Sequence, residues 1–296
     1  MRIRIQNLNK IYKNGNQALK DVNLDIGNGM FGLLGPNGAG KSTLMRILVT
    51  LMKPSSGSVT VNDWDLQKNR RHIRKLLGYL PQEFRFFSKL KTWEFLDYSA
   101  GLAGIRNRKV RSRQVDEMLD QVGLFEVRER MANKLSGGMK RRLGIAQALI
   151  GEPKIVVVDE PTTGLDPEER IKFRNLLSDM SQKNIIIILS THIVADISST
   201  CKSMALLNEG EVVFYGPPER LIDVAKDHVF LIQATMGDFE TIKERFPVIS
   251  TIPSEEGWEV QVVADKIDGF RAERIYPSLE HAYVYFMEYQ QDRVVY

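Results

Sequence analysis

A glycine-rich stretch, Gly35-Pro-Asn-Gly-Ala-Gly-Lys-Ser-Thr43, has the residue types and spacing of a phosphate-binding loop. It follows a short apolar run, residues 30–34, and precedes a helix-compatible segment, residues 44–49. Glycines adopt backbone torsions that a Cβ forbids, so successive N–H groups can turn inward around a polyphosphate. The helix start adds the positive end of its dipole. We therefore predict a phosphate site rather than a turn that merely ends a strand.

Two side chains of this loop have predicted roles of their own. Lys41 supplies a positive charge for the β- and γ-phosphates, and the Ser42 hydroxyl is placed to ligate Mg²⁺. The predicted nucleotide-binding residues are the whole loop: Gly35, Pro36, Asn37, Gly38, Ala39, Gly40, Lys41, Ser42 and Thr43.

Two carboxylates end an apolar, β-branched run at residues 154–160, which is typical of a buried strand. Neighbouring strand residues point to opposite sides. Asp159 is therefore predicted to hold Mg²⁺, while Glu160 faces elsewhere and polarises an attacking water. Pro161 then breaks the strand.

Further polar groups follow other predicted strands. Gln82 comes after a strand at residues 76–80 and Pro81, and His192 comes after a buried strand at residues 184–191. In open α/β sheets, ligands bind beyond the carboxyl ends of strands. Gln82 is predicted to touch Mg²⁺ or a water near the γ-phosphate, and His192 to contact the γ-phosphate. For Tyr12, before the turn at residues 13–17, stacking on adenine and packing on a sheet edge remain equal alternatives.

A second glycine pair opens a long helix, in Leu135-Ser-Gly-Gly-Met-Lys-Arg-Arg142. Ser136 is a natural N-cap, and Gly137 and Gly138 leave backbone N–H groups open. The three cations that follow are unfavourable with the helix dipole by roughly 0.3–1 kcal/mol each. This favours a second anion site at the helix start. The alternative is that the three side chains extend into solvent.

The order of elements predicts two domains. Residues 1–29 suggest antiparallel strands, and a helical segment with its own apolar periodicity begins near residue 83. Pro217-Pro218 precedes a mixed series of short helices and strands. We predict an ATPase-type domain at residues 1–216, with a helical subdomain at about 83–150, and a small α+β accessory domain at residues 217–296.

Charge is unevenly distributed between these parts. Residues 217–296 carry 8 Lys and Arg against 15 Asp and Glu, and residues 1–216 carry 33 against 22, for net charges of −7 and +11. A basic body suits polyphosphate, anionic lipid or nucleic acid. The single cysteine, Cys201, fits a reducing cytosol. With no run near the ~18 apolar residues of a membrane span, any membrane role would require a partner.

Taken in order, these motifs resemble the ATP-binding subunit of an ABC (ATP-binding cassette) transporter, over about residues 1–216. Walker A alone would indicate only a P-loop NTPase, whereas the Leu135–Met139 match to the ABC signature makes the likeness specific. One departure is that Met139 and Lys140 stand where many members have Gln. The motifs correspond as follows: Tyr12 to the adenine-stacking residue, Gly35–Thr43 to Walker A, Gln82 to the Q-loop, Ser136, Gly137 and Gly138 to the signature, Ile155–Asp159 with Glu160 to Walker B and its base, Asp166 to the D-loop and His192 to the switch histidine.

The resemblance implies an α/β fold: a P-loop NTPase core with an antiparallel β subdomain and an inserted helical subdomain, plus the small C-terminal domain. It implies ATP and Mg²⁺ as cofactors, with each ATP held between Walker A of one chain and the signature of another. The partners it implies are a second copy or a sister ATPase subunit, and a polytopic membrane permease that holds the chain at the cytoplasmic face of the membrane. No direct binding of nucleic acid is expected.

Export is the expected direction, because Pro277-Ser-Leu-Glu280 and the aromatic helix after it resemble the C-terminal extension of antibiotic-export ATPases. Two alternatives stay open: an importer ATPase, and a soluble ABC ATPase acting on nucleic acid or ribosomes. The second is disfavoured because only about 95 residues separate Walker A from the signature and the chain carries one cassette.

Overall fold

The computed structural model describes residues 1–83, 89–254 and 257–290. Its contacts divide the chain into two units. The first comprises Met1–His192 and Leu207–Val212, and the second Ile193–Leu206 and Val213–Tyr296. The predicted domain boundary at residue 216 remains a prediction.

An antiparallel sheet in the first unit has the strand order β2-β1-β4-β5. Alternating burial along β1 puts Ile3 and Ile5 inside and their neighbours outside, as expected for a sheet with one covered face. The four strands span Ile3–Ile11 (β1), Gln17–Ile26 (β2), Ser56–Val61 (β4) and Trp64–Asp65 (β5).

The centre of this unit is a set of parallel strands in the order β3-β8-β7-β6. Every residue of β7 and β8 is buried, which fits the continuous apolar character of their sequences. These strands and the core helices span Gly29–Leu34 (β3), Lys41–Leu48 (α1), Arg70–Arg74 (α2), Leu77–Leu80 (β6), Ile155–Asp159 (β7), Pro167–Ser181 (α6) and Ile186–Thr191 (β8).

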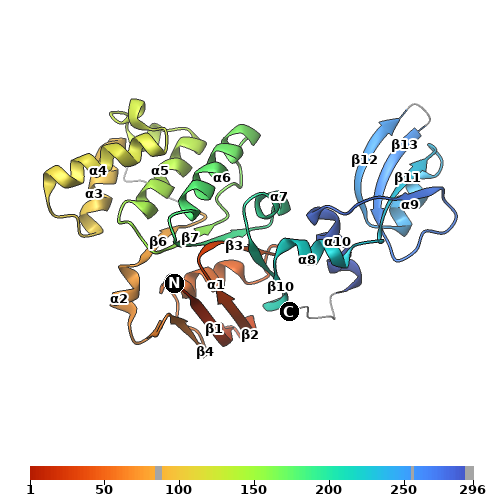
Figure 1. Cartoon of the computed structure of the whole chain (residues 1–296), viewed down its shortest axis with the longest axis horizontal. Coiled ribbons are helices and arrows are strands. Elements are labelled where there is room, and N and C mark those ends of the chain that lie inside the picture. Colours follow the sequence, from red (N-terminus) through yellow and green to blue (C-terminus); the bar gives the residue numbers. More distant parts are fainter. Residues whose placement is uncertain (84–88, 255–256, 291–296) are drawn as a thin grey trace. The chain divides into compact units, whose positions relative to one another are not determined.

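A group of helices is inserted between β6 and β7 (Figure 1). The predicted apolar periodicity is visible in α4, where Val115 and Leu119 are buried one helical turn apart. The inserted elements are α3 (Thr92–Leu102), α4 (Arg108–Gln121), the short 3₁₀ helices η1 (Phe125–Val127) and η2 (Ala132–Lys134), and α5 (Gly137–Leu149).

The second unit contains a four-stranded antiparallel sheet in the order β12-β13-β11-β14. Ile232, Val260, Val262 and Ile242 form its apolar core. The unit begins at Ile193, and the division between the units runs through β9 and β10. The elements from Ile193 onward span Val194–Ser198 (α7), Ser203–Asn208 (β9), Glu211–Gly216 (β10), Pro218–Val224 (α8), Val229–Ala234 (β11), Phe239–Arg245 (α9), Val248–Ser254 (β12), Gly257–Val263 (β13), Ala272–Arg274 (β14) and Leu279–Tyr289 (α10).

The predicted fold class is confirmed: a mixed α/β cassette with an antiparallel subdomain and a helical insertion. In the described part of the chain, none of the helices has the length and apolar character required to cross a bilayer.

A buried histidine in the first turn of α10, a helix capped by Ser278, joins that helix to the sheet of the second unit. Ser278 N–H donates to His281 Nδ1 (3.0 Å), which leaves the proton on Nε2, 2.9 Å from Gln261 Oε1. The imidazole is therefore neutral in this arrangement. Burial lowers the pKa of His281 below its ordinary value of 6.5, although Glu280 acts in the opposite direction.

We predict that His281 makes the second unit less stable in acid. The unfolded chain binds a proton at this residue near pH 6.5, whereas the folded chain does so only at a lower pH. The contribution of neutral His281 to the free energy of unfolding is therefore complete above pH 6.5. It is lost as pH falls from there through the lowered pKa of the folded state. In thermal melts between pH 7.5 and 5, the wild type should lose more stability than His281→Gln. Equal losses in the two proteins would contradict this assignment.

Candidate functional site

Four neighbouring parallel strands end at one edge of the central sheet, and each is followed by a predicted site residue. Leu34 of β3 pairs with Thr191 of β8, so Gly35 and His192 leave the sheet side by side. Asp159 of β7 pairs with Ser190, and Leu80 of β6 pairs with Val158. The parallel register therefore brings together the phosphate loop, Gln82, Glu160 and His192.

The loop after β3 approaches other backbone so closely that two of its glycines cannot be replaced without displacement. A Cβ on Gly35 would lie 2.2 Å from Leu207 O, and one on Gly40 would lie 2.4 Å from Ala18 O. Gly40 also has φ of +103°, which an L side chain rarely adopts. The tight loop ends at the N-terminus of α1, where backbone N–H groups and the helix dipole favour an anion.

Lys41 is folded back into this loop. Its Nζ donates to Gly35 O (2.7 Å) and Pro36 O (3.0 Å) and lies 3.5 Å from Glu160 Oε1. Burial lowers the pKa of Lys41, and the negative charge of Glu160 acts in the opposite direction. The Lys41 ammonium is thus held beside the loop by carbonyl oxygens, and phosphate oxygens can replace these as hydrogen-bond acceptors.

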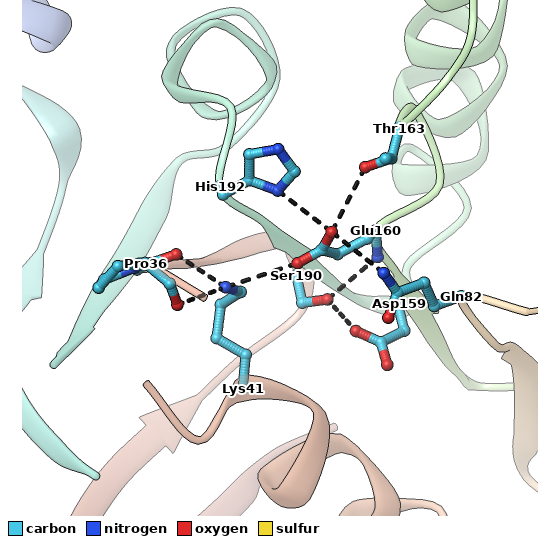
Figure 2. A network of polar contacts seen from close by, with 9 residues as sticks. Pro36, Lys41, Gln82, Asp159, Glu160, Thr163, Ser190 and His192 are labelled. Carbon is cyan, nitrogen blue, oxygen red and sulfur yellow. Dashed lines mark hydrogen bonds and ion pairs between the residues drawn. The ribbon is translucent and has the colours of Figure 1, made fainter. Parts of the chain in front are cut away.

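Glu160 is the centre of the polar network shown in Figure 2. His192 Nδ1 is 3.1 Å from Glu160 Oε2, Gln82 Nε2 is 3.5 Å from the same oxygen, and Thr163 Oγ1 is 3.4 Å away. The backbone of Glu160 has φ of +45°, an uncommon conformation for a residue with a side chain. Such strain persists only where surrounding contacts enforce it, and it is frequent at functional sites.

Ser190 supplies much of that enforcement and was not among the predicted site residues. Its Oγ donates to Asp159 Oδ1 and accepts the backbone N–H of Glu160 (3.1 Å). The same N–H lies 3.0 Å from Ser190 O, and Ser190 is fully buried. One hydroxyl on β8 therefore fixes both carboxylate residues of the neighbouring strand. The sequence signal was a polar residue at the end of an apolar strand.

A cavity of about 320 Å³ joins the phosphate loop to Tyr12. The Tyr12 hydroxyl is 3.0 Å from Thr43 Oγ1, and Asn16 and Ala18 also line the cavity. The described lining residues are Tyr12, Asn16, Ala18, Asn37, Gly38, Ala39, Gly40, Lys41, Ser42, Thr43, Gln82 and Glu160. A cavity lined by an aromatic residue and by a phosphate loop offers groups that suit the base and the phosphates of a nucleotide.

The predicted signature and D-loop residues are not among the described residues lining this cavity. Ser136 caps α5 by accepting the Met139 N–H (3.2 Å), and Gly137 and Gly138 form the first turn of that helix. Asp166 caps α6 by accepting the Glu169 N–H (2.8 Å). Both groups stand at helix starts, outside the pocket built by the phosphate loop.

Two of the three cations after the signature do not extend into solvent, which corrects one of the alternatives drawn from the sequence. Arg141 Nη1 donates to Gln82 O (2.7 Å) and lies 3.4 Å from Pro81 O. Arg142 donates to the carbonyls of Val122 and Gly123 (both 3.2 Å). These contacts compensate for the unfavourable interaction of the cations with the helix dipole.

The predicted Mg²⁺ ligands fit a hard cation. Ser42 offers a hydroxyl, Gln82 an amide oxygen and Asp159 a carboxylate, and Mg²⁺ takes such oxygen ligands together with water and phosphate. Asp159 is only 3% exposed, and a buried carboxylate needs a cation or strong donors nearby.

Comparisons with known proteins agree with this geometry. The ABC transporter family model matches residues 19–163. The phosphonates import ATP-binding protein PhnC 2 of Synechococcus sp. is 35% identical over 243 residues, covering 77% of this chain and 90% of the relative. The chain belongs to the ATP-binding proteins of ABC transporters.

Two further similarities bear on function. The probable multidrug ABC transporter ATP-binding protein YbhF of Escherichia coli is 38% identical over 201 residues, covering 68% of this chain and 34% of the relative. The dimeric structure of a post-hydrolysis state of the ATP-binding cassette MJ0796, bound to ADP and Pi, has a TM-score of 0.67 and 28% identity, covering 73% of this chain and 98% of that chain. As a member of this family, the present chain binds ATP and is an ATPase.

We predict that Ser190→Ala weakens the use of Mg²⁺ more than the binding of ATP. Without the Ser190 hydroxyl, the Asp159 carboxylate is no longer fixed. The Mg²⁺ concentration for half-maximal hydrolysis should rise roughly tenfold, as expected for loss of a hydrogen bond to a charged group. Binding of a fluorescent ATP analogue in EDTA should change by less than about twofold.

Ser190→Thr, which keeps a hydroxyl, is the matched control and should recover most of the Mg²⁺ dependence. If Ser190→Ala titrates with Mg²⁺ like the wild type, Ser190 does not position Asp159.

Proposed function

We propose that this chain is the ATP-hydrolysing subunit of an ABC exporter, and that it pairs around two ATP molecules to drive a separate membrane subunit. The observation that carries the proposal is the convergence of Lys41, Gln82 and His192 on the buried Glu160 carboxylate beside the phosphate loop. These are the groups needed for positioning a polyphosphate and activating a water.

In this proposal the phosphate loop and Lys41 hold the β- and γ-phosphates, and Tyr12 stacks on the adenine. Ser42, Asp159 and Gln82 hold Mg²⁺, which neutralises charge on the phosphates when bound. On ATP binding, Lys41 exchanges its carbonyl contacts in the loop for phosphate oxygens. Glu160 then accepts a proton from the attacking water, and His192 orients the γ-phosphate.

A second cassette completes the site in this proposal. Ser136, Gly137 and Gly138 stand at the start of α5, where backbone N–H groups favour an anion, yet they do not line the chain's own nucleotide cavity within the described residues. Head-to-tail pairing places the signature of one chain against the nucleotide of the other, and a two-fold interface does so twice. Asp166 lies at the start of α6 and is proposed to belong to the same interface.

We predict that Glu160→Gln lowers the turnover of bound ATP by about 10²–10⁴-fold, the usual contribution of a general base. The amide keeps the shape of the side chain but does not accept the proton of the attacking water. The same variant should elute as a dimer in ATP and as a monomer without nucleotide in size-exclusion chromatography. Hydrolysis at the wild-type rate would show that another group activates the water.

Export, rather than import, is proposed from the C-terminal part of the chain. The stretch Pro277-Ser-Leu-Glu280 forms the start of α10, and Ser278 caps that helix. One relative is named as a phosphonates import protein, and another as a probable multidrug transporter protein with no direction in its name. Import through the same cassette is therefore the second candidate. Residues 217–296 are proposed as the accessory domain, and residues 1–216 as the ATPase domain.

Co-purification from native membranes tests the partner. A tagged Glu160→Gln chain, held closed with ATP, should recover a polytopic membrane subunit, which would place the chain at the cytoplasmic face of the membrane. Recovery of ribosomes or nucleic acid from the soluble fraction would overturn the transport proposal. In inside-out vesicles carrying the recovered complex with the wild-type cassette, ATP-driven uptake of its substrate indicates export, and ATP-driven release indicates import.

A further inference from the structure

Arg141, the fifth residue of α5, is a cation that contacts other parts of the molecule. Positive charges near a helix N-terminus are unfavourable, and hydrogen-bond partners offset this cost. Arg141 has such partners in the segment that follows β6. Its guanidinium donates to Gln82 O at 2.7 Å and lies 3.4 Å from Pro81 O.

The contact reaches the candidate catalytic base in one further step. Gln82, whose backbone oxygen accepts from Arg141, points its side chain at Glu160, with Nε2 3.5 Å from Oε2. The N-terminal part of α5 is thereby connected to Glu160 through Gln82. The signature residues Ser136, Gly137 and Gly138 begin the same helix.

The neighbouring Arg142 connects the start of α5 to two further parts of the chain. Its Nε lies 3.3 Å from Glu169 Oε2 of α6. Its Nη1 donates to the carbonyl oxygens of Val122 and Gly123, the two residues directly after α4. Glu169 also packs so closely on Gly138 that an added Cβ there would lie 2.5 Å from its carboxylate. Arg141 therefore lies near the end of a helix that is held by contacts with α6 and with the residues after α4.

We propose that Arg141 is a positioning residue for hydrolysis, which holds the backbone of Gln82 so that its side chain meets Glu160. This inference rests on the proposed function, because it assigns Arg141 a role through Gln82 and Glu160. A change in the position of the signature helix would be passed to the base of the same chain by this route. The guanidinium suits the task because it presents several fixed donors to carbonyl oxygens.

The test is a double-mutant cycle on the purified full-length chain, with Arg141→Ala, Gln82→Ala and the double variant. Arg141→Ala should lower kcat roughly tenfold, as expected for loss of a charged hydrogen bond, with KM for ATP within about twofold. Because Arg141 acts through Gln82, the double variant should be no slower than the slower single variant. Arg141→Lys, which keeps the charge and one donor, should recover part of kcat.

Lys134→Ala is the control for loss of a cation near the start of α5. Lys134 is exposed, and its removal should leave kcat within about twofold of the wild type. Independent, multiplied losses in the double variant would overturn the proposal, as would wild-type kcat in Arg141→Ala. A lowered melting temperature in Arg141→Ala that Arg141→Lys restores without restoring kcat would also overturn it. If wild-type hydrolysis does not depend on Glu160, the proposed function fails first, and this is a distinguishable result.

Discussion

Parallel pairing of β3, β8, β7 and β6 is the constraint on which the site depends. Each strand is followed within two residues by a predicted site residue, namely Gly35, His192, Glu160 or Gln82, and the register aligns the strand ends at one edge. A slip of one residue in β7 would turn Asp159 and Glu160 to the opposite faces of the sheet. Because every residue of β7 is buried, such a slip would also disturb the packing on both faces of the strand and separate the Asp159 carboxylate from Ser190.

The same register explains how a strained carboxylate is kept in place. Glu160 is 6% exposed and has a left-handed backbone, two features that each cost free energy. Both are offset by local partners: Ser190 binds its backbone N–H, and Lys41 supplies the opposite charge. The strained residue thus lies where the chemistry is proposed, directly after β7 and beside β8, the two strands whose residues are all buried.

Most of the core and of the candidate site could be predicted from the sequence because glycine spacing and strand-terminal polar residues are local signals. Ser190 and Arg141 could not, because their partners lie 31 and 59 residues away and are determined by register and helix packing. The edge strands of the second unit, β12 and β14, could not be predicted from the sequence either. β14 has three exposed residues, and β12 is only half-buried at best, so neither shows the alternation that indicates a strand.

The arrangement of cations around α5 shows why position in three dimensions decides the role of a residue. From the sequence, Lys140, Arg141 and Arg142 form one basic cluster that favours an anion. In the structure, Arg141 and Arg142 turn to different elements and bind backbone carbonyls, so these two cations are engaged inside the molecule. The N–H groups at the start of α5 are positive groups that favour an anion there. An anion site made of backbone N–H groups requires a fixed position of the helix start. The contacts of Arg141 and Arg142 fix that position. A chain that builds the phosphate loop and the signature on separate, braced elements is suited to sharing one nucleotide between two copies.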